Sequence, residues 1–405
     1  MTFHDGTAFD ADAVVASFQR ILDPATAAPG RFVLTSIDEV RAVDATTVER
    51  VTDPPFAPLL AHLAHPVAAI VPVAQAADLA RNPVGTGPYA FVRWVDGSEV
   101  VLQADADYWG GAPAIAEVVV RIIPEVSTQV VELRSGGVDM IFNLPADNFL
   151  TLVSDPALET GTLPGWGSAH LGFNVANPKL ADVRVRRALA HAIDEALITE
   201  EFFRGLAAPG VAPIPGTVRY AADLPEPYPY DVEGAKALLA AAGAEGLSLR
   251  LDVFQNPDLE SVAQVLQFAF AEIGVDLEIR VQDFSAYTQA VESDDVELWM
   301  TSWGTVTLDA DYTLYAFFHS GQVPANNRSR WVDADIDALL QEGRDNPDDA
   351  ARAAAYLEVQ ERAVAELPMV TLYYPLFTYA KRPSVQGEVL AFSWILLDLR
   401  NATLD

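Results

Sequence analysis

The strongest constraint on the fold is the regular alternation of helix-patterned and strand-patterned segments in the second half of the chain. Residues 232–242 and 259–273 carry apolar side chains at helical spacing. Residues 247–254, 275–281 and 298–302 are instead rich in β-branched and aliphatic side chains. Strands that alternate with helices at this spacing are typical of an α/β lobe, which is the fold class we predict.

The first half of the chain shows a similar organisation. Helical spacing begins after Asp10 and ends at Asp23-Pro24, and a second helix is predicted at residues 127–133. Residues 89–94 and 99–103 flank a turn at Asp96-Gly97 and predict a hairpin. Because 405 residues are too many for one compact core, the sequence predicts two α/β lobes joined by a few chain crossings.

Two segments in the middle of the chain carry more specific expectations. Asp182 is predicted to cap a long helix whose apolar residues recur at i, i+4 spacing as far as Leu197. Residues 209–229 are rich in proline, glycine and tyrosine, and they predict a long surface connection.

Composition excludes several functional classes. With 25 basic and 57 acidic residues the net charge is −32, which repels phosphate backbones and argues against a nucleic-acid partner. The absence of cysteine excludes disulfides, thiol nucleophiles and thiolate metal sites. No apolar run approaches the roughly 18 residues of a membrane helix.

Short stretches that resemble cofactor or catalytic motifs lack the neighbouring residues that those motifs require. Residues 85–90 fit the pattern G-x-G-x-x-A, but Pro88 and the strand-like run after it deny the helix that a dinucleotide site requires. Residues 333–337 resemble the start of a calcium loop, yet its sixth and twelfth positions hold Ala338 and Arg344. His62 and His65 have no third ligand nearby, and no nucleophile elbow or phosphate loop occurs. We therefore predict no metal, no cofactor and no enzymatic activity.

Several stretches resemble a known family, in order and at natural spacings from one end of the chain to the other. They are residues 3–9 (FHDGTAF), 83–89 (PVGTGPY), 136–139 (GGVD), 173–174 (FN), 182–189 (DVRVRRAL) and 192–194 (AID). The ordered set is similar to the family 5 solute-binding proteins of ABC importers, which bind dipeptides, oligopeptides or nickel.

Within this family the chain most resembles the glutathione-binding branch. The stretches that carry this likeness are residues 60–66 (LAHLAHP), 303–314 (WGTVTLDADYTL), Asn326-Asn327 and 392–395 (FSWI).

The resemblance implies a type II (cluster C) periplasmic-binding-protein-like fold, with two lobes that hinge and close over a ligand in an interlobe cleft. It places a small subdomain of lobe I at residues 1–82, the rest of lobe I at 83–172 and 373–405, and lobe II at 173–372.

The resemblance also implies the ligand-binding residues, which are Phe173, Asn174, Trp303, Gly304, Thr305, Asp309 and Asp311. A loop after the strand at 298–302 reaches the cleft, where Trp303 stacks on the ligand. Thr305 donates hydrogen bonds and Asp309 supplies a counter-charge for an ammonium group. Asn174 is expected to meet the ligand backbone. Peptide-binding members place an aspartate three residues after this tryptophan, where this chain has Val306; Asp309 or Asp311 is expected to replace it.

The implied function is capture of a small peptide-like solute, glutathione or a di- or oligopeptide, by a monomer that delivers it to an ABC permease. A binding protein that reports ligand to a membrane receptor is the main alternative, and a peptide hydrolase is the third. The implied location is extracytoplasmic, in the periplasm or at the cell surface, with a lipid anchor in the full-length form. Because no leader is visible at Met1 and the family carries strands before its F-H-D-G segment, we expect an N-terminally truncated chain.

Overall fold

The computed structural model describes residues 1–28, 30–387 and 397–405. The chain divides into two compact units. Unit 1 comprises residues 1–162 and 378–405, and unit 2 comprises residues 163–377. No helix in the described ranges is long and apolar enough to cross a membrane.

Unit 2 is built on a mixed sheet in which β12 has a central position. The strand order is β11-β10-β12-β8-β13, and β9 also pairs with β13. The strands are β8 (Gly167–Phe173), β9 (Ala207–Pro209), β10 (Ser248–Phe254), β11 (Asp276–Gln282), β12 (Leu298–Gly304) and β13 (Met369–Lys381). β10 runs parallel to both β11 and β12, whereas β8 runs antiparallel to β12 and β13. The strands predicted at 247–254, 275–281 and 298–302 are thereby confirmed.

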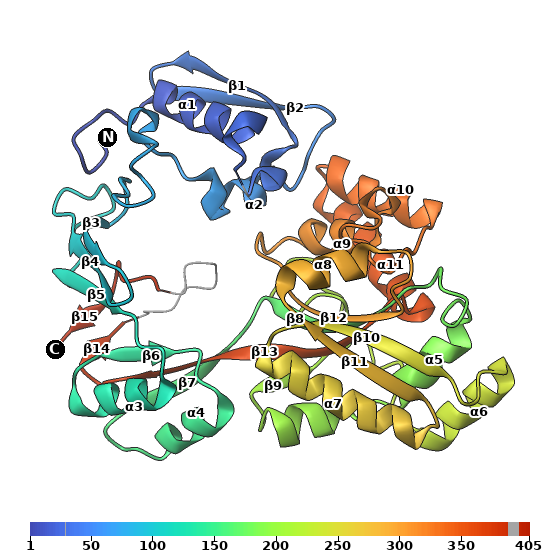
Figure 1. Ribbon diagram of the computed structural model, residues 1–405. Helices are drawn as coiled ribbons and strands as arrows, with labels where there is room; N and C mark the ends of the chain where they lie inside the picture. Colours follow the sequence, from blue (N-terminus) through green and yellow to red (C-terminus); the bar gives the residue numbers. More distant parts are fainter. Residues whose placement is uncertain (29, 388–396) are drawn as a thin grey trace. The chain divides into compact units, whose positions relative to one another are not determined.

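Helices cover both faces of this sheet (Figure 1). They are α5 (Val183–His191), α6 (Val232–Ala242), α7 (Pro257–Glu272), α8 (Phe284–Glu292), α9 (Ala310–Phe318), α10 (Ala334–Asp345) and α11 (Asp349–Glu366), with a π-helix at Leu197–Phe202 and a short 3-10 helix at Ser320–Gln322. Alternate residues of β12 serve the two faces: Leu298 and Met300 belong to the core under α5, α6 and α7, and Trp299 to the core under α8 to α11. This alternation follows from the two-residue period of a strand.

Close packing around Trp299 requires a glycine on the neighbouring strand. Trp299 is fully buried and lies opposite Gly172 of β8. A Cβ atom on Gly172 would lie 2.0 Å from the indole ring, so any larger residue would displace the tryptophan.

The long helix predicted from Asp182 to Leu197 is wrong in its second half. Asp182 caps α5 as expected, its carboxylate accepting the Arg184 amide at 2.9 Å, but α5 ends at His191. The Asp194 carboxylate accepts the Leu197 amide at 3.2 Å and so starts a separate helical turn. Aspartate side chains compete with the backbone for such amides, which is why the apolar spacing did not extend the helix.

The segment at residues 209–229 is also less exposed than predicted. Ala212, Ile214 and Val218 are buried, and Ile214 and Val218 join the core around Trp299. Proline and glycine content indicated irregular backbone correctly, but it carries no information on whether that backbone is covered.

Unit 1 contains smaller sheets. The strands β1 and β2 form a hairpin, β3, β4 and β5 form a three-stranded sheet, and β14 pairs with β15. The strands are β1 (Ile37–Asp44), β2 (Thr47–Thr52), β3 (Tyr89–Val95), β4 (Glu99–Ala104), β5 (Glu117–Arg121), β6 (Met140–Phe142), β7 (Glu159–Pro164), β14 (Val385–Gln386) and β15 (Thr403–Leu404). The predicted hairpin is confirmed, and residues 85–88 lead into β3, not into a helix.

The helices of unit 1 are α1, which packs against β1 and β2, and three others. They are α1 (Ala11–Leu22), α2 (Leu59–Leu63), α3 (Val126–Ser135) and α4 (Ala146–Val153), with short turns at Pro24–Thr26, Arg31–Leu34, Pro66–Ala68 and Val73–Gln75. Asp10 caps α1 through the Ala13 amide at 3.0 Å. His62 is buried and hydrogen-bonds the Val33 carbonyl oxygen at 2.7 Å, which is a structural role.

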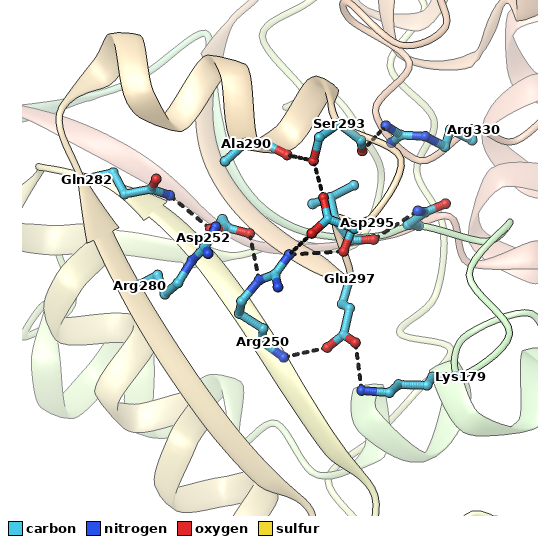
Figure 2. A network of polar contacts seen from close by, with 12 residues as sticks. Lys179, Arg250, Asp252, Arg280, Gln282, Ala290, Ser293, Asp295, Glu297 and Arg330 are labelled. Carbon is cyan, nitrogen blue, oxygen red and sulfur yellow. Dashed lines mark hydrogen bonds and ion pairs between the residues drawn. The ribbon is translucent and has the colours of Figure 1, made fainter.

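A polar network crosses one face of the sheet in unit 2 (Figure 2). The Asp252 carboxylate, which is 0% exposed, accepts hydrogen bonds from Arg280 at 2.7 and 2.9 Å and from Gln282 at 2.8 Å. Arg250 lies 3.6 Å from its other oxygen. A carboxylate without water needs such partners, so these arginines make the buried charge tolerable.

We expect Asp252→Ala to destabilise the protein by about 2 kcal/mol or more, because the arginines lose their buried partner. Denaturant unfolding followed by tryptophan fluorescence measures this change. Asp295→Ala is the matched control, since Asp295 pairs with Arg250 at 3.3 Å but is 77% exposed. Equal unfolding midpoints for the two variants would contradict the assignment.

Candidate functional site

The end of β12 brings the predicted site residues Trp303 and Gly304 into the sheet. Both were expected in a loop, but β12 continues through Gly304 and pairs with β8, Trp303 opposite Ser168 and Gly304 opposite Gly167. The strand is longer than its apolar run because this antiparallel pairing supplies backbone hydrogen bonds whatever the side chains are.

Trp303 is half-buried and held in place by α9. Its Nε1 donates to Thr313 Oγ1 at 3.0 Å, and its ring lies 4.9 Å from that of Phe317. Thr305 is buried, and its hydroxyl shares a 2.7 Å hydrogen bond with the same Thr313. The indole is therefore oriented before any ligand arrives.

Asp309 and Asp311 are buried at the start of α9, where each faces an arginine. Arg352 Nη2 donates to both Asp309 oxygens, at 2.8 and 2.9 Å. Arg344 Nε lies 3.1 Å from Asp311. Burial raises the pKa of the Asp309 carboxyl, and the Arg352 guanidinium acts in the opposite direction. Ligand contact by these aspartates stays a prediction, and both already neutralise an internal cation.

We expect Asp309→Asn to cost about 3 kcal/mol in free energy of unfolding, because it leaves the buried Arg352 charge without a partner. Urea denaturation of the variant checks this value. Asp349→Asn removes an exposed acid that contacts Arg219 and Tyr220, and it should change the unfolding free energy little. A loss in Asp309→Asn no larger than in this control would overturn the structural role.

Phe173 and Asn174 lie at the opposite end of β8. Phe173 pairs with Leu298, six residues before Gly304, which corresponds to roughly 20 Å along a strand. Asn174 is 1% exposed, and its side chain donates to the Val296 carbonyl oxygen at 2.9 Å and accepts the Ala176 amide at 3.1 Å. The structure therefore separates these two predicted site residues from the five at residues 303–311.

A hollow opens where β10 and β12 end, and we call it the strand-end hollow. It measures about 610 Å³ including the part open to solvent. Its lining includes Gly167, Asn256, Asp258, Ser302, Trp303 and Tyr373. Ligand sites in α/β folds gather at the carboxyl ends of parallel strands, so this hollow is the candidate binding site within unit 2.

Sequence reasoning missed Asn256 and Asp258 in this lining. Asn256 caps α7, its side-chain oxygen accepting the Asp258 and Leu259 amides at 3.1 Å each. Both residues directly follow the predicted strand at 247–254. That position was the available signal, but it becomes informative only once β10 is known to run parallel to β12.

A buried polar chain involving Ser168 bears on the hydrolase alternative. Ser168 Oγ lies 2.7 Å from His170 Nε2, and His170 Nδ1 lies 3.2 Å from Thr371 Oγ1. Burial lowers the pKa of His170 to about 3, so the imidazole stays neutral. Ser168 is 2% exposed. This arrangement supplies partners for buried groups, as interiors require, and it engages the Ser168 hydroxyl in a hydrogen bond although Ser168 contributes to the lining of the strand-end hollow.

A smaller hollow beside β13 contains an unusual carboxyl group. Glu195 and Glu226 line it together with Tyr228 and Thr371. Burial raises the pKa of Glu195 to about 8, with Glu226 and Asp194 adding to the shift. The folded protein therefore keeps this proton at a pH where the unfolded chain has lost it.

The stability contribution of Glu195 should fall as pH rises from about 4.5 to about 8, because the folded state binds the proton more tightly than the unfolded state in that window. We expect Glu195→Gln to melt at increasingly higher temperature than wild type over this range. Melting curves at pH 5 and pH 8 check the difference; a constant offset would contradict it.

Among the described ranges, no three His, Cys, Asp or Glu side chains are arranged to hold a metal ion. Asp333, at the start of the calcium-like stretch, caps α10 through the Asp335 and Ile336 amides. That carboxylate is thus a helix cap.

The fold and the site residues define a protein of the periplasmic-binding-protein class. Residues 1–325 match the family described as bacterial extracellular solute-binding proteins, family 5 Middle. The chain belongs to this family, which confirms the resemblance drawn from its motifs, and its role is to bind a solute.

Relatives and solved structures agree with this assignment. The chain is 29% identical to di/tripeptide-binding protein 2 of Pseudomonas aeruginosa (strain UCBPP-PA14), covering 95% of this chain and 77% of that protein. It is 27% identical to the glutathione-binding protein GsiB of Pectobacterium atrosepticum, covering 91% and 74%. The ABC transporter-associated periplasmic binding protein DppA of Helicobacter pylori, solved with the peptide STSA, superimposes with a TM-score of 0.82 at 26% identity, covering 99% and 84%. The predicted fold class is thereby confirmed. Residues 392–395, part of the glutathione-branch likeness, lie outside the described residues.

Proposed function

We propose that this protein captures a small peptide-like solute, glutathione or a short peptide, outside the cytoplasm and delivers it to an ABC permease. The observation that carries the proposal is the strand-end hollow. Trp303, which the family resemblance predicts to bind the ligand, is one of the residues that line it. The names of the relatives support a peptide-like ligand, and the family description supports an extracellular location.

Unit 1 and unit 2 act as the two lobes in this proposal, and the protein works as a monomer. The chain passes between the units at residues 162–163 and 377–378, and these crossings serve as the hinge. A ligand that binds the closed form more tightly than the open form shifts the population toward closure. The closed form then presents the surface that the permease recognises.

The protein binds its ligand without turnover in this proposal. The relatives and the structural neighbour are named as binding proteins, and Ser168 is buried in its polar chain. A ligand sensor for a membrane receptor would use the same hollow and the same closure. Stimulated uptake by a reconstituted permease, as opposed to receptor activation, separates these two roles.

We expect glutathione or a di- or tripeptide to raise the melting temperature of the purified chain. A ligand that binds only the folded state at 100 times its Kd adds about 2.7 kcal/mol of stability. A thermal-shift screen against glutathione, alanine peptides of two to five residues, sugars and nickel–histidine measures this effect.

Sugars are the negative control in this screen, and product analysis after incubation tests for turnover. A shift with sugars or nickel–histidine alone would refute the peptide-like ligand. Cleavage of a peptide would refute binding without turnover.

A further inference from the structure

The strand-end hollow contains one carboxylate, Asp258. Among the described residues that line the hollow, the only other ionisable side chain is the weakly acidic phenol of Tyr373. Asp258 occupies the first turn of α7, the 16-residue helix from Pro257 to Glu272 that starts just beyond the end of β10. Because Asn256 already caps this helix, the Asp258 carboxylate is not needed for capping.

Asp258 lacks the arginine partner that three buried aspartates of unit 2 possess. Asp252, Asp309 and Asp311 are each buried and each paired with an arginine. Over the ranges that the structure describes, the Asp258 carboxylate makes no ion pair and no side-chain hydrogen bond, and its residue is exposed. The N-terminus of α7 supplies a partial positive charge to Asp258, and a full counter-charge comes from solvent or from a ligand.

The walls of the hollow suit a cationic group. Tyr373 contributes to the lining, and aromatic faces attract ammonium and guanidinium ions. The exposed Ser302 side chain adds a hydroxyl group that can accept a hydrogen bond from such a cation. Desolvation by neighbouring atoms raises the pKa of Asp258.

We propose that Asp258 determines ligand specificity by binding the ammonium group of the solute in the strand-end hollow. This inference rests on the proposed function, and it assigns the anchoring charge to α7 in place of the predicted Asp309 and Asp311. Peptides and glutathione carry an α-ammonium group, and simple diamines carry the same charge without a peptide bond.

The test is isothermal titration of the full chain with trialanine, glutathione, N-acetyl-trialanine and cadaverine. Wild type is compared with Asp258→Asn and Asp258→Glu, and Glu245→Gln is the control for loss of one exposed charge. We expect trialanine or glutathione to bind wild type and the control with equal affinity. Asp258→Asn should bind the same ligand at least tenfold more weakly, because this is the usual loss when a charged hydrogen bond is removed. Asp258→Glu should recover part of the affinity.

Acetylation and pH report on the ammonium contact directly. N-acetyl-trialanine should bind weakly to wild type and no more weakly to Asp258→Asn, since the partner group is absent. Because cation binding needs the ionised carboxylate, wild-type affinity for trialanine should fall as pH is lowered, with a midpoint above the ordinary 3.8, and Asp258→Asn should lack this transition.

The outcomes separate the two proposals. If trialanine or glutathione binds wild type and Asp258→Asn equally, the anchor is refuted and the proposed function stands. If cadaverine alone binds, and Asp258→Asn abolishes it, the anchor stands and the peptide-like ligand is refuted. If none of the probes binds wild type, both are refuted.

Discussion

The pairing of β12 is the constraint on which the rest of unit 2 depends. β12 runs parallel to β10 on one side and antiparallel to β8 on the other. The parallel neighbour brings two carboxyl ends, and the loops after them, to one edge of the sheet. The antiparallel neighbour fixes Trp303 beside Ser168 at the same edge. The strand-end hollow is thus a consequence of strand direction. Crevices of this kind are expected at the edge of a sheet where neighbouring strands are connected in opposite directions.

Unit 2 pairs three of its buried acids with arginine. Asp252, Asp309 and Asp311 lie in low-dielectric surroundings, and each is matched by a guanidinium group. Arginine suits this task because its planar fork donates several hydrogen bonds and stays charged when buried. Asp258 and Glu195 each line a hollow, and neither has an arginine partner among the described residues. In a protein of net charge −32, acidity says little, and the pattern of pairing is the informative quantity.

Much of the fold could be predicted because it follows from local patterns. The strands β10, β11 and β12 and their helices were evident from periodicity, and the caps at Asp10 and Asp182 from residue type. Two predictions that were wrong have different causes, one local and one long-range. The helix from Asp182 ended early where Asp194 captured a backbone amide, and the proline-rich segment at 209–229 was buried by contacts with distant residues.

The sequence by itself determined the family, the α/β class and the residues around Trp303, because ordered motifs and side-chain periods are properties of the chain. Only the tertiary structure decided which of these residues share a site. It placed Phe173 and Asn174 at the far end of β8, paired Asp309 with Arg352, and brought Asp258 to the hollow beside Trp303. The physical reason is that strand register and charge pairing join residues far apart in sequence, and no local pattern records which partner a side chain will meet.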